Sequence, residues 1–425
     1  MIRTFSEQGL IFFCNEKCQW TWDAAIFGEN DISGNVLGLL RLKIQALDVN
    51  TQQALKVASC LGSSFSLQTL KLIVNRANSI ECALSTGLIT QQNGSDRVYS
   101  FVHDQIQEAA FSLLPADPRQ IFLYIGQKLW ALYSKNELIE NIFVVIHLLN
   151  YAKDLITDQE QRSKVAELFL LAGNRAITST AFTQACEYLE AGINMLGENC
   201  WEFKYDLSLK LHDAAAKMCY CISNYTSLDI YIKAISKNAA SALHTVQTYA
   251  LQIRLYNDNR KFQDAFDTAV CILNKIGENI NYTQSEAEID SLIDKTKLLL
   301  NGKSYEEITE MEEMQDESKL AIMMILSESL STLHFFNPQL YCLVSLRMVH
   351  LTLQCGISKF SPLGFIALGS ALCGRNTKDR FPYELGKLSI KILDKIYVKE
   401  FVPWVSFLLS FPTFLTPVFL LKNLS

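Results

Sequence analysis

The segment 298–304, LLLNGKS, is the part of the chain most similar to a nucleotide-binding loop, because it ends in Gly302, Lys303 and Ser304. A P-loop also needs a glycine at the position of Lys297 and a strand before the loop, so that backbone N–H groups can cradle phosphate oxygens. The residues before this segment have helical apolar spacing instead. We therefore expect no nucleotide site here and no ATP binding by the chain.

His103 and Asp104 are the most suggestive pair for acid–base chemistry. Neighbours in a helix point in different directions, so these two side chains cannot relay a proton to each other. Asp104 would lie in the first helical turn, where a carboxylate stabilises the helix dipole. We expect His103 to cap or pack against a helix and not to act in catalysis.

The twelve cysteines include two close pairs, Cys14 with Cys18 and Cys219 with Cys221. A zinc site needs four ligands, usually from two short-spaced pairs, and neither pair has a second pair nearby in the sequence. The chain shows no disulfide framework spacing, and its first residues do not read as a signal peptide. These observations predict buried, reduced thiols in a cytoplasmic protein, with no metal and no cofactor.

A DNA-reading helix is the remaining chemical possibility, at residues 66–76. Its basic side chains are Lys71 and Arg76, and the whole chain has a formal charge of -6. DNA binding requires clustered Lys and Arg that contact phosphates and bases. We therefore expect no nucleic-acid partner, although a winged-helix DNA-binding regulator stays an alternative.

The elements around that helix predict a winged-helix-like module over residues 35–117. Helices are expected from Val36, from caps at Thr51 and Ser66, near Ile80, and over residues 103–114. Asn93-Gly94 lies between two short strand-like segments, GLITQQ and VYSFV, and is a strong hairpin turn. Three helices, a hairpin and a closing helix describe this module.

Residues 118–397 predict TPR-like helical repeats. Phe182, Tyr225 and Phe262 begin similar small-and-large apolar patterns that recur about every 40 residues. Gly (18) and Pro (8) are scarce, which favours long helices over many short strands. An acidic segment near residues 303–319 interrupts the pattern and is expected to be solvated. The predicted fold class is mainly α, a winged-helix-like module followed by an irregular TPR-like α-solenoid.

Both ends of the chain differ from the rest. Residues 1–30 read as a strand pair or arm whose aromatic side chains would have packed on a preceding domain. Residues 398–425 form an apolar tail that reads as aberrant, and 401–421 carry no charge. Pro403, Pro412 and Pro417 would interrupt a membrane helix there, so the tail is expected to fold back or to drive association, with a membrane span as the alternative. We expect a fragment whose association is relieved by stopping the chain near Lys395.

Two stretches resemble a known family. Residues 34–70, GNVLGLLRLKIQALDVNTQQALKVASCLGSSFSLQTL, together with YSFVHDQIQEAAFSLLP at 99–115, resemble the region after the nucleotide-binding core in STAND-type predicted ATPases. These proteins combine a Ser/Thr kinase-like domain, an AAA-type ATPase, this helical region, sensor domains and often a histidine kinase. The resemblance covers about residues 5–397 and implies that residues 1–30 are a remnant linker or arm from a missing ATPase core. The Walker motifs and the kinase and sensor modules are not in this chain, so no catalytic, cofactor-binding or metal residue is implied.

The predicted function is a non-catalytic regulatory and protein-interaction scaffold segment of a signal-transduction ATPase or kinase. Its partner would be another protein, or neighbouring kinase and ATPase modules, bound through the helical repeats. Besides the DNA-binding regulator, a second alternative is an ATP-dependent signalling enzyme whose catalytic domains lie outside this chain.

Overall fold

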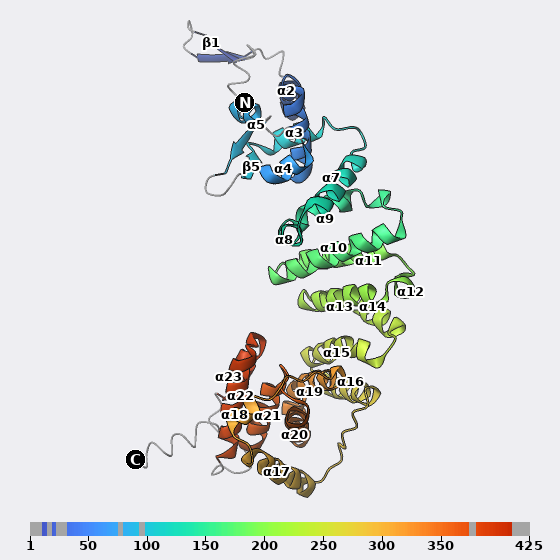
Figure 1. Ribbon diagram of the computed structural model, residues 1–425, viewed down its shortest axis with the longest axis vertical. Coiled ribbons are helices and arrows are strands. Elements are labelled where there is room, and N and C mark those ends of the chain that lie inside the picture. Colours follow the sequence, from blue (N-terminus) through green and yellow to red (C-terminus); the bar gives the residue numbers. More distant parts are fainter. Residues whose placement is uncertain are drawn as a thin grey trace, which may run out of the picture. The chain divides into compact units, whose positions relative to one another are not determined.

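The computed structural model describes residues 11–14, 19–22, 32–74, 80–92, 98–373 and 380–409. The protein is mainly α, as the sequence predicts, with a few short strands near the N-terminus (Figure 1). It divides into two compact units, residues 1–200 and 201–425. The division falls inside the predicted repeat region.

The first unit begins with an antiparallel strand pair, β1 (Ile11–Cys14) and β2 (Gln19–Trp22). Phe13 is directly opposite Trp20, and the Phe13 side chain is half exposed. The strand pair expected from the sequence is therefore present.

The next elements follow the order predicted for the winged-helix-like module. They are α2 (Ile32–Gln45), α3 (Val49–Leu61), β3 (Ser64–Ser66), α4 (Leu67–Ile73), α5 (Ile80–Ser85), β4 (Ile89–Gln91), β5 (Val98–Phe101) and α6 (Asp104–Phe111). The strands form one antiparallel sheet in the order β3-β5-β4. The predicted hairpin is β4 with β5, whereas the predicted Asn93-Gly94 turn lies outside the described residues. The strand β3 was not predicted.

Helix starts in this module are set by side-chain caps. Ser66 caps α4 as expected, accepting a hydrogen bond from the Gln68 N–H at 3.2 Å. The predicted cap at Thr51 is wrong, because Asp48 caps α3 and accepts from the Asn50 and Thr51 N–H groups. Thr51 is buried one turn into the helix and donates its hydroxyl to Asp48. Asp is among the best capping residues, and here it lies three positions upstream.

The first unit continues as helices. They are α7 (Arg119–Leu132), α8 (Lys135–Glu140), α9 (Ile142–Tyr151), the 3-10 turn η2 (Lys153–Leu155), α10 (Gln159–Thr178) and α11 (Phe182–Leu196), and α12 (Cys200–Phe203) follows at the boundary. Helix α7 packs on α9, and α10 packs on α11. Phe122 and Phe169 are fully buried, whereas Phe182, at the first position of α11, is only half buried.

The second unit contains the remaining helices. They are α13 (Tyr205–Cys221), α14 (Tyr225–Asn238), the 3-10 turn η3 (Ala242–Thr245), α15 (Val246–Asp258), α16 (Phe262–Lys275), α17 (Glu286–Asn301), α18 (Tyr305–Thr309), α19 (Glu317–Phe336), α20 (Pro338–Cys355), α21 (Ser361–Cys373), α22 (Phe381–Ile396), the 3-10 turn η4 (Lys399–Phe401) and α23 (Val402–Leu409). Helices α13 and α14 pair, as do α15 and α16.

The same type of turn connects the two helices in three pairs, α10 with α11, α13 with α14, and α15 with α16. Thr180, Ser223 and Arg260 have φ values of 59°, 59° and 57°, which is the left-handed region. In each turn, the next N–H bonds a carbonyl five residues back, for example Asn224 to Cys219 at 2.8 Å. This pattern is the Schellman motif. Phe182, Tyr225 and Phe262 follow two residues later, so the predicted repeat corresponds to a repeated turn.

The core of the second unit lies among α15, α16, α19, α20, α21 and α23. An ion pair lies at its edge, between buried Glu278 and half-buried Arg347, with the guanidinium Nε 2.5 Å from Oε1 and Nη2 3.0 Å from Oε2. Helix α19 is the one described helix long and apolar enough to cross a membrane, and many of its residues are in this core. Helices buried in the core of a protein meet the same criteria of length and hydropathy, so α19 is weak evidence for a membrane span.

The acidic segment is ordered around α18. Ser304 forms a capping box with Glu307 at the start of α18. Its backbone then joins the α20–α21 connection, where the Met314 N–H donates to the Ile357 carbonyl at 2.8 Å. Its carboxylates are mainly exposed, as expected for a solvated segment, while its backbone is fixed in place.

The described part of the apolar tail folds back on the core. In α23, Val405 and Leu408 are 1% and 0% exposed, and Phe401 contacts Phe360 with ring centroids 5.9 Å apart. Residues 410–425 of the predicted tail lie outside the described residues.

Candidate interaction site

The P-loop-like residues lie on helices. Lys297 is inside α17, and Gly302 caps its C-terminus with an ordinary helical φ of -83°. Ser304 is the N-cap of α18, and its hydroxyl accepts from the Glu307 N–H at 3.1 Å. A helix therefore precedes this segment, where a P-loop requires a strand.

His103 is the N-cap of α6. Its Nδ1 accepts a hydrogen bond from the Gln105 N–H at 3.2 Å, and Asp104 occupies the first helical turn. This geometry gives His103 the capping role that the sequence favoured over catalysis.

The cysteine pairs do not assemble into a metal site within the part of the chain that the structure describes. Cys219 is buried and Cys221 is exposed on α13, Cys14 ends β1, and Cys18 lies outside the described residues. No group of three or more His, Cys, Asp or Glu residues among those described could hold a metal ion. Burial raises the pKa of the Cys60 thiol to about 12, which keeps this thiol protonated and unreactive.

The helix considered as a possible DNA reader, α4, is held by its neighbours. Within the first unit, the Thr69 hydroxyl of α4 lies 2.9 Å from the Tyr133 hydroxyl, and Lys128 of α7 donates to the Ile73 carbonyl at 3.2 Å. Gln68 donates to Glu137 of α8 at 3.3 Å. Lys71 is exposed, and Arg76 lies outside the described residues. One face of α4 is therefore occupied by the following helices.

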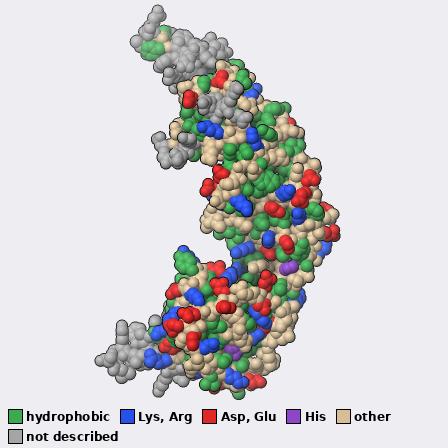
Figure 2. All heavy atoms as spheres, viewed as in Figure 1, with side chains coloured by type: hydrophobic (Ala, Val, Ile, Leu, Met, Phe, Trp, Pro, Cys, Tyr) green, Lys and Arg blue, Asp and Glu red, His purple; other side chains and the backbone are tan. Residues whose placement is uncertain are grey.

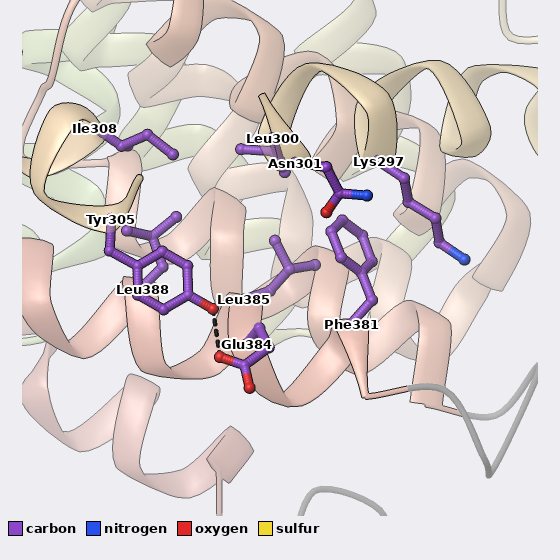
Figure 3. A pocket seen from close by; sticks show the side chains of 9 residues that line it. All are labelled: Lys297, Leu300, Asn301, Tyr305, Ile308, Phe381, Glu384, Leu385 and Leu388. Carbon is purple, nitrogen blue, oxygen red and sulfur yellow. Dashed lines mark hydrogen bonds between the residues drawn. The ribbon is translucent and has the colours of Figure 1, made fainter. Parts of the chain in front are cut away.

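A pocket of about 320 Å³ lies in the second unit between α17, α18 and α22 (Figure 3). Four aliphatic side chains form its buried wall, and aromatic and polar side chains complete it. The lining residues are Lys297, Leu300, Asn301, Tyr305, Ile308, Phe381, Glu384, Leu385 and Leu388. This volume is at the lower end of what small-ligand pockets offer, and it also suits one large side chain of a bound peptide.

The polar groups of the pocket are oriented by specific contacts. The Tyr305 hydroxyl donates to Oε2 of Glu384, and burial together with this bond raises the pKa of Tyr305 above its usual value. Lys297 places its ammonium 5.5 Å from the Phe381 ring centroid and extends past that ring, away from Tyr305 (Figure 3). Asn301 is exposed beside the same ring.

Sequence reasoning missed this pocket as a site. Three of its lining residues, Lys297, Leu300 and Asn301, enter the sequence analysis only through the comparison with a P-loop. The pocket joins residues 297–308 to 381–388, and no local spacing links two segments so far apart in sequence.

Comparison with known proteins finds no matching family model. The chain is 23% identical over 483 residues to the hybrid signal transduction histidine kinase G of Dictyostelium discoideum. That alignment covers 93% of this chain and 14% of the relative, so the chain spans about one seventh of that protein. Among solved structures, a STAND protein with a tetratricopeptide repeat sensor from Pyrococcus horikoshii is 15% identical, with a TM-score of 0.31 over 89% of this chain and 68% of that one.

Proposed function

We propose that this chain is a regulatory and protein-interaction scaffold segment of a signal-transduction protein and performs no catalytic step itself. The observation that carries the proposal is the repeated helical hairpin, closed at Thr180, Ser223 and Arg260 by the same left-handed turn. Stacked helical hairpins present extended surfaces that proteins use to bind other proteins. The similarity to a hybrid signal transduction histidine kinase supports a signalling context.

Residues 35–117 would serve as a winged-helix-like packing module that connects to the repeats. The contacts of α4 with α7 and α8 support this role, because they use the face of α4 that carries Thr69 and Gln68. We propose that a shift of the module is passed to α7 and α8 through these contacts. We propose a cytoplasmic location for this segment and no nucleic-acid partner.

The partner would be a kinase or ATPase module, on the same polypeptide or on another one. In the alternative, an ATP-dependent signalling enzyme, such modules would carry out the catalysis outside this chain. The relative leaves room for them, because it is about seven times longer than the stretch that this chain matches. Under both hypotheses the helical repeats supply binding and not chemistry.

A photo-crosslinking amino acid placed on the repeats tests this function in the cells that make the protein. Ile230 on α14 and Phe335 on α19 are suitable sites, with 60% and 71% of their side chains exposed. Val49, 78% exposed at the start of α3, is the control outside the repeats. Mass spectrometry should identify a kinase or ATPase sequence crosslinked to the repeat positions and not to Val49. Equal crosslinking from Val49, or products without such sequences, would contradict the proposal.

A further inference from the structure

We propose that the pocket between α17, α18 and α22 binds a basic peptide segment of a partner protein and takes in one large apolar side chain. This inference rests on the proposed interaction function and assigns a specific site and ligand chemistry to it. Its first basis is the pocket itself, whose wall is formed by the buried aliphatic side chains of Leu300, Ile308, Leu385 and Leu388. A fully desolvated apolar anchor in such a pocket contributes most of the binding energy in many interfaces.

Charge identifies the chemistry of the occupant. Residues 286–317, which contain α17 and α18, carry eleven Asp and Glu against three Lys, a net charge of -8. The whole chain has a net charge of -6, so the remaining residues together carry +2. The acidic surface is therefore concentrated on the segment that builds two sides of the pocket. Figure 2 shows Asp and Glu side chains, with Lys or Arg side chains among them, where Figure 1 places α18 and α22.

Some of this charge is already compensated within the unit. Lys391 of α22 pairs with Glu306 at 3.0 Å, and Lys387 lies 4.0 Å from Glu384. These pairs are largely exposed and leave the excess of carboxylates on α17 and α18 in place. Opposite charge on a partner speeds encounter and fixes orientation, so a segment with Lys or Arg on both sides of the apolar anchor suits this surface.

Glu384 gives the site its directional contact. The Tyr305 hydroxyl holds Oε2, which fixes the carboxylate at the edge of the pocket while Oε1 faces outward toward the exposed Lys387. A cationic side chain next to the anchor could bind this preoriented carboxylate, with the Phe381 ring beside it.

Fluorescence polarisation of labelled peptides with the purified full chain tests the proposal. The probes are short Gly/Ser peptides with a central Leu or Phe flanked by Lys, and two matched sets replace the centre by Ser or the flanks by Glu. Lys-flanked peptides with an apolar centre should bind more than about tenfold more tightly than either matched set. Added salt should weaken this binding. Equal binding of the three sets would overturn the proposal.

Variants on the rim of the pocket locate the binding. Asn301→Trp fills the opening from an exposed position and should reduce affinity by about tenfold or more. Glu384→Gln keeps an acceptor for Tyr305 and should weaken Lys-flanked peptides by roughly twofold to fivefold. Asp394→Asn changes an exposed carboxylate further along α22 and is the matched control, expected to leave affinity unchanged.

The two experiments separate failure of this site from failure of the scaffold function. If neither rim variant reduces binding, or Asp394→Asn reduces it equally, the pocket proposal is wrong. Crosslinks from Ile230 and Phe335 to a kinase or ATPase would still support the scaffold function in that case. Absence of both results would reject both proposals.

Discussion

Gly173 on α10 lies directly against Leu189 on α11, so close that a Cβ at Gly173 would be 2.7 Å from Cδ2 and 2.8 Å from Cγ of Leu189. Both residues are buried, and Ala172 and Ala185 beside them are fully buried too. The absence of a side chain at position 173 therefore sets how closely these two helices approach.

Gly173→Ala should destabilise the first unit. Overpacking a buried contact typically costs about 1–3 kcal/mol, which exceeds the gain of up to about 1 kcal/mol from the higher helix propensity of Ala. Urea unfolding measures the change. The control is Gly38→Ala in α2, because no heavy atom of the described residues lies within 4 Å of its added Cβ. That variant should be neutral or more stable, and an equal loss at both positions would contradict the close-packing argument.

Ser223→Gly should stabilise the second unit by about 1 kcal/mol. Ser223 has a φ of 59°, and a left-handed backbone costs a non-glycine residue about 1–2 kcal/mol, which the greater freedom of Gly in the unfolded chain partly offsets. Gly277→Ala should lower the thermal unfolding midpoint, because Gly277 has a φ of 83° in the same kind of turn after α16. Thr226→Gly, in the first turn of α14, is the control and should destabilise. Stabilisation by Thr226→Gly as well would point to a cause other than the turn.

These turns show how far the sequence predicted the fold. The apolar pattern after Phe182, Tyr225 and Phe262 located the helices correctly, because each pattern marks the face that packs on its partner. It did not reveal the left-handed residue two positions earlier, since Thr, Ser and Arg are not the glycine that usually marks such a turn. The pattern also ranked Phe182 with the buried residues, although its place at the start of α11 leaves it half buried.

The candidate site was less predictable than the fold. His103 could be assigned as a cap because the signal is local, with an apolar run directly after it. Asp48 and Thr51 show the limit of that approach, because both can cap and only the backbone geometry selects Asp48. Tyr305 and Glu384 are brought together by the packing of α18 on α22, which no periodicity within either segment encodes.

Asp213 on α13 should make stability fall as pH rises. Burial raises the pKa of Asp213 from 3.8 to about 7, and its Oδ1 has no hydrogen-bond partner among the described residues. Between these values the folded state binds more protons than the unfolded state, so the free energy of unfolding decreases by up to about 1.4 kcal/mol for each pH unit. This loss of stability is complete above the pKa of Asp213 in the folded state, and it is absent below the pKa of Asp213 in the unfolded state.

Asp213→Asn should remove this contribution. Urea unfolding of both proteins at pH values from about 4 to about 8, in steps of roughly one unit, gives the free energy of unfolding as a function of pH. The slopes of the two curves are then compared. The variant should gain stability relative to the parent as pH rises. The exposed Asp206 of the same helix provides the matched control, and Asp206→Asn should keep the parental slope. Parallel profiles for the parent and Asp213→Asn would show that Asp213 is not the titrating group.

The described part of the tail changes where the chain should be shortened. Stopping near Lys395 would remove Val405 and Leu408, which are 1% and 0% exposed in the core of the second unit. Loss of large buried side chains costs about 2–5 kcal/mol each, so this truncation should destabilise the unit and expose the faces of α21 and α22 that α23 covers.

Stopping after Leu409 keeps α23 and removes only residues 410–425, whose apolar stretch is the expected cause of association. Size-exclusion chromatography and urea unfolding of the full chain and both truncations test this. The chain that ends at Leu409 should be monomeric with the stability of the full chain. The chain that ends near Lys395 should be less stable and more prone to associate. A parental unfolding midpoint after truncation at Lys395 would contradict the packing of α23, and association that persists in the chain ending at Leu409 would show that residues 410–425 do not cause it.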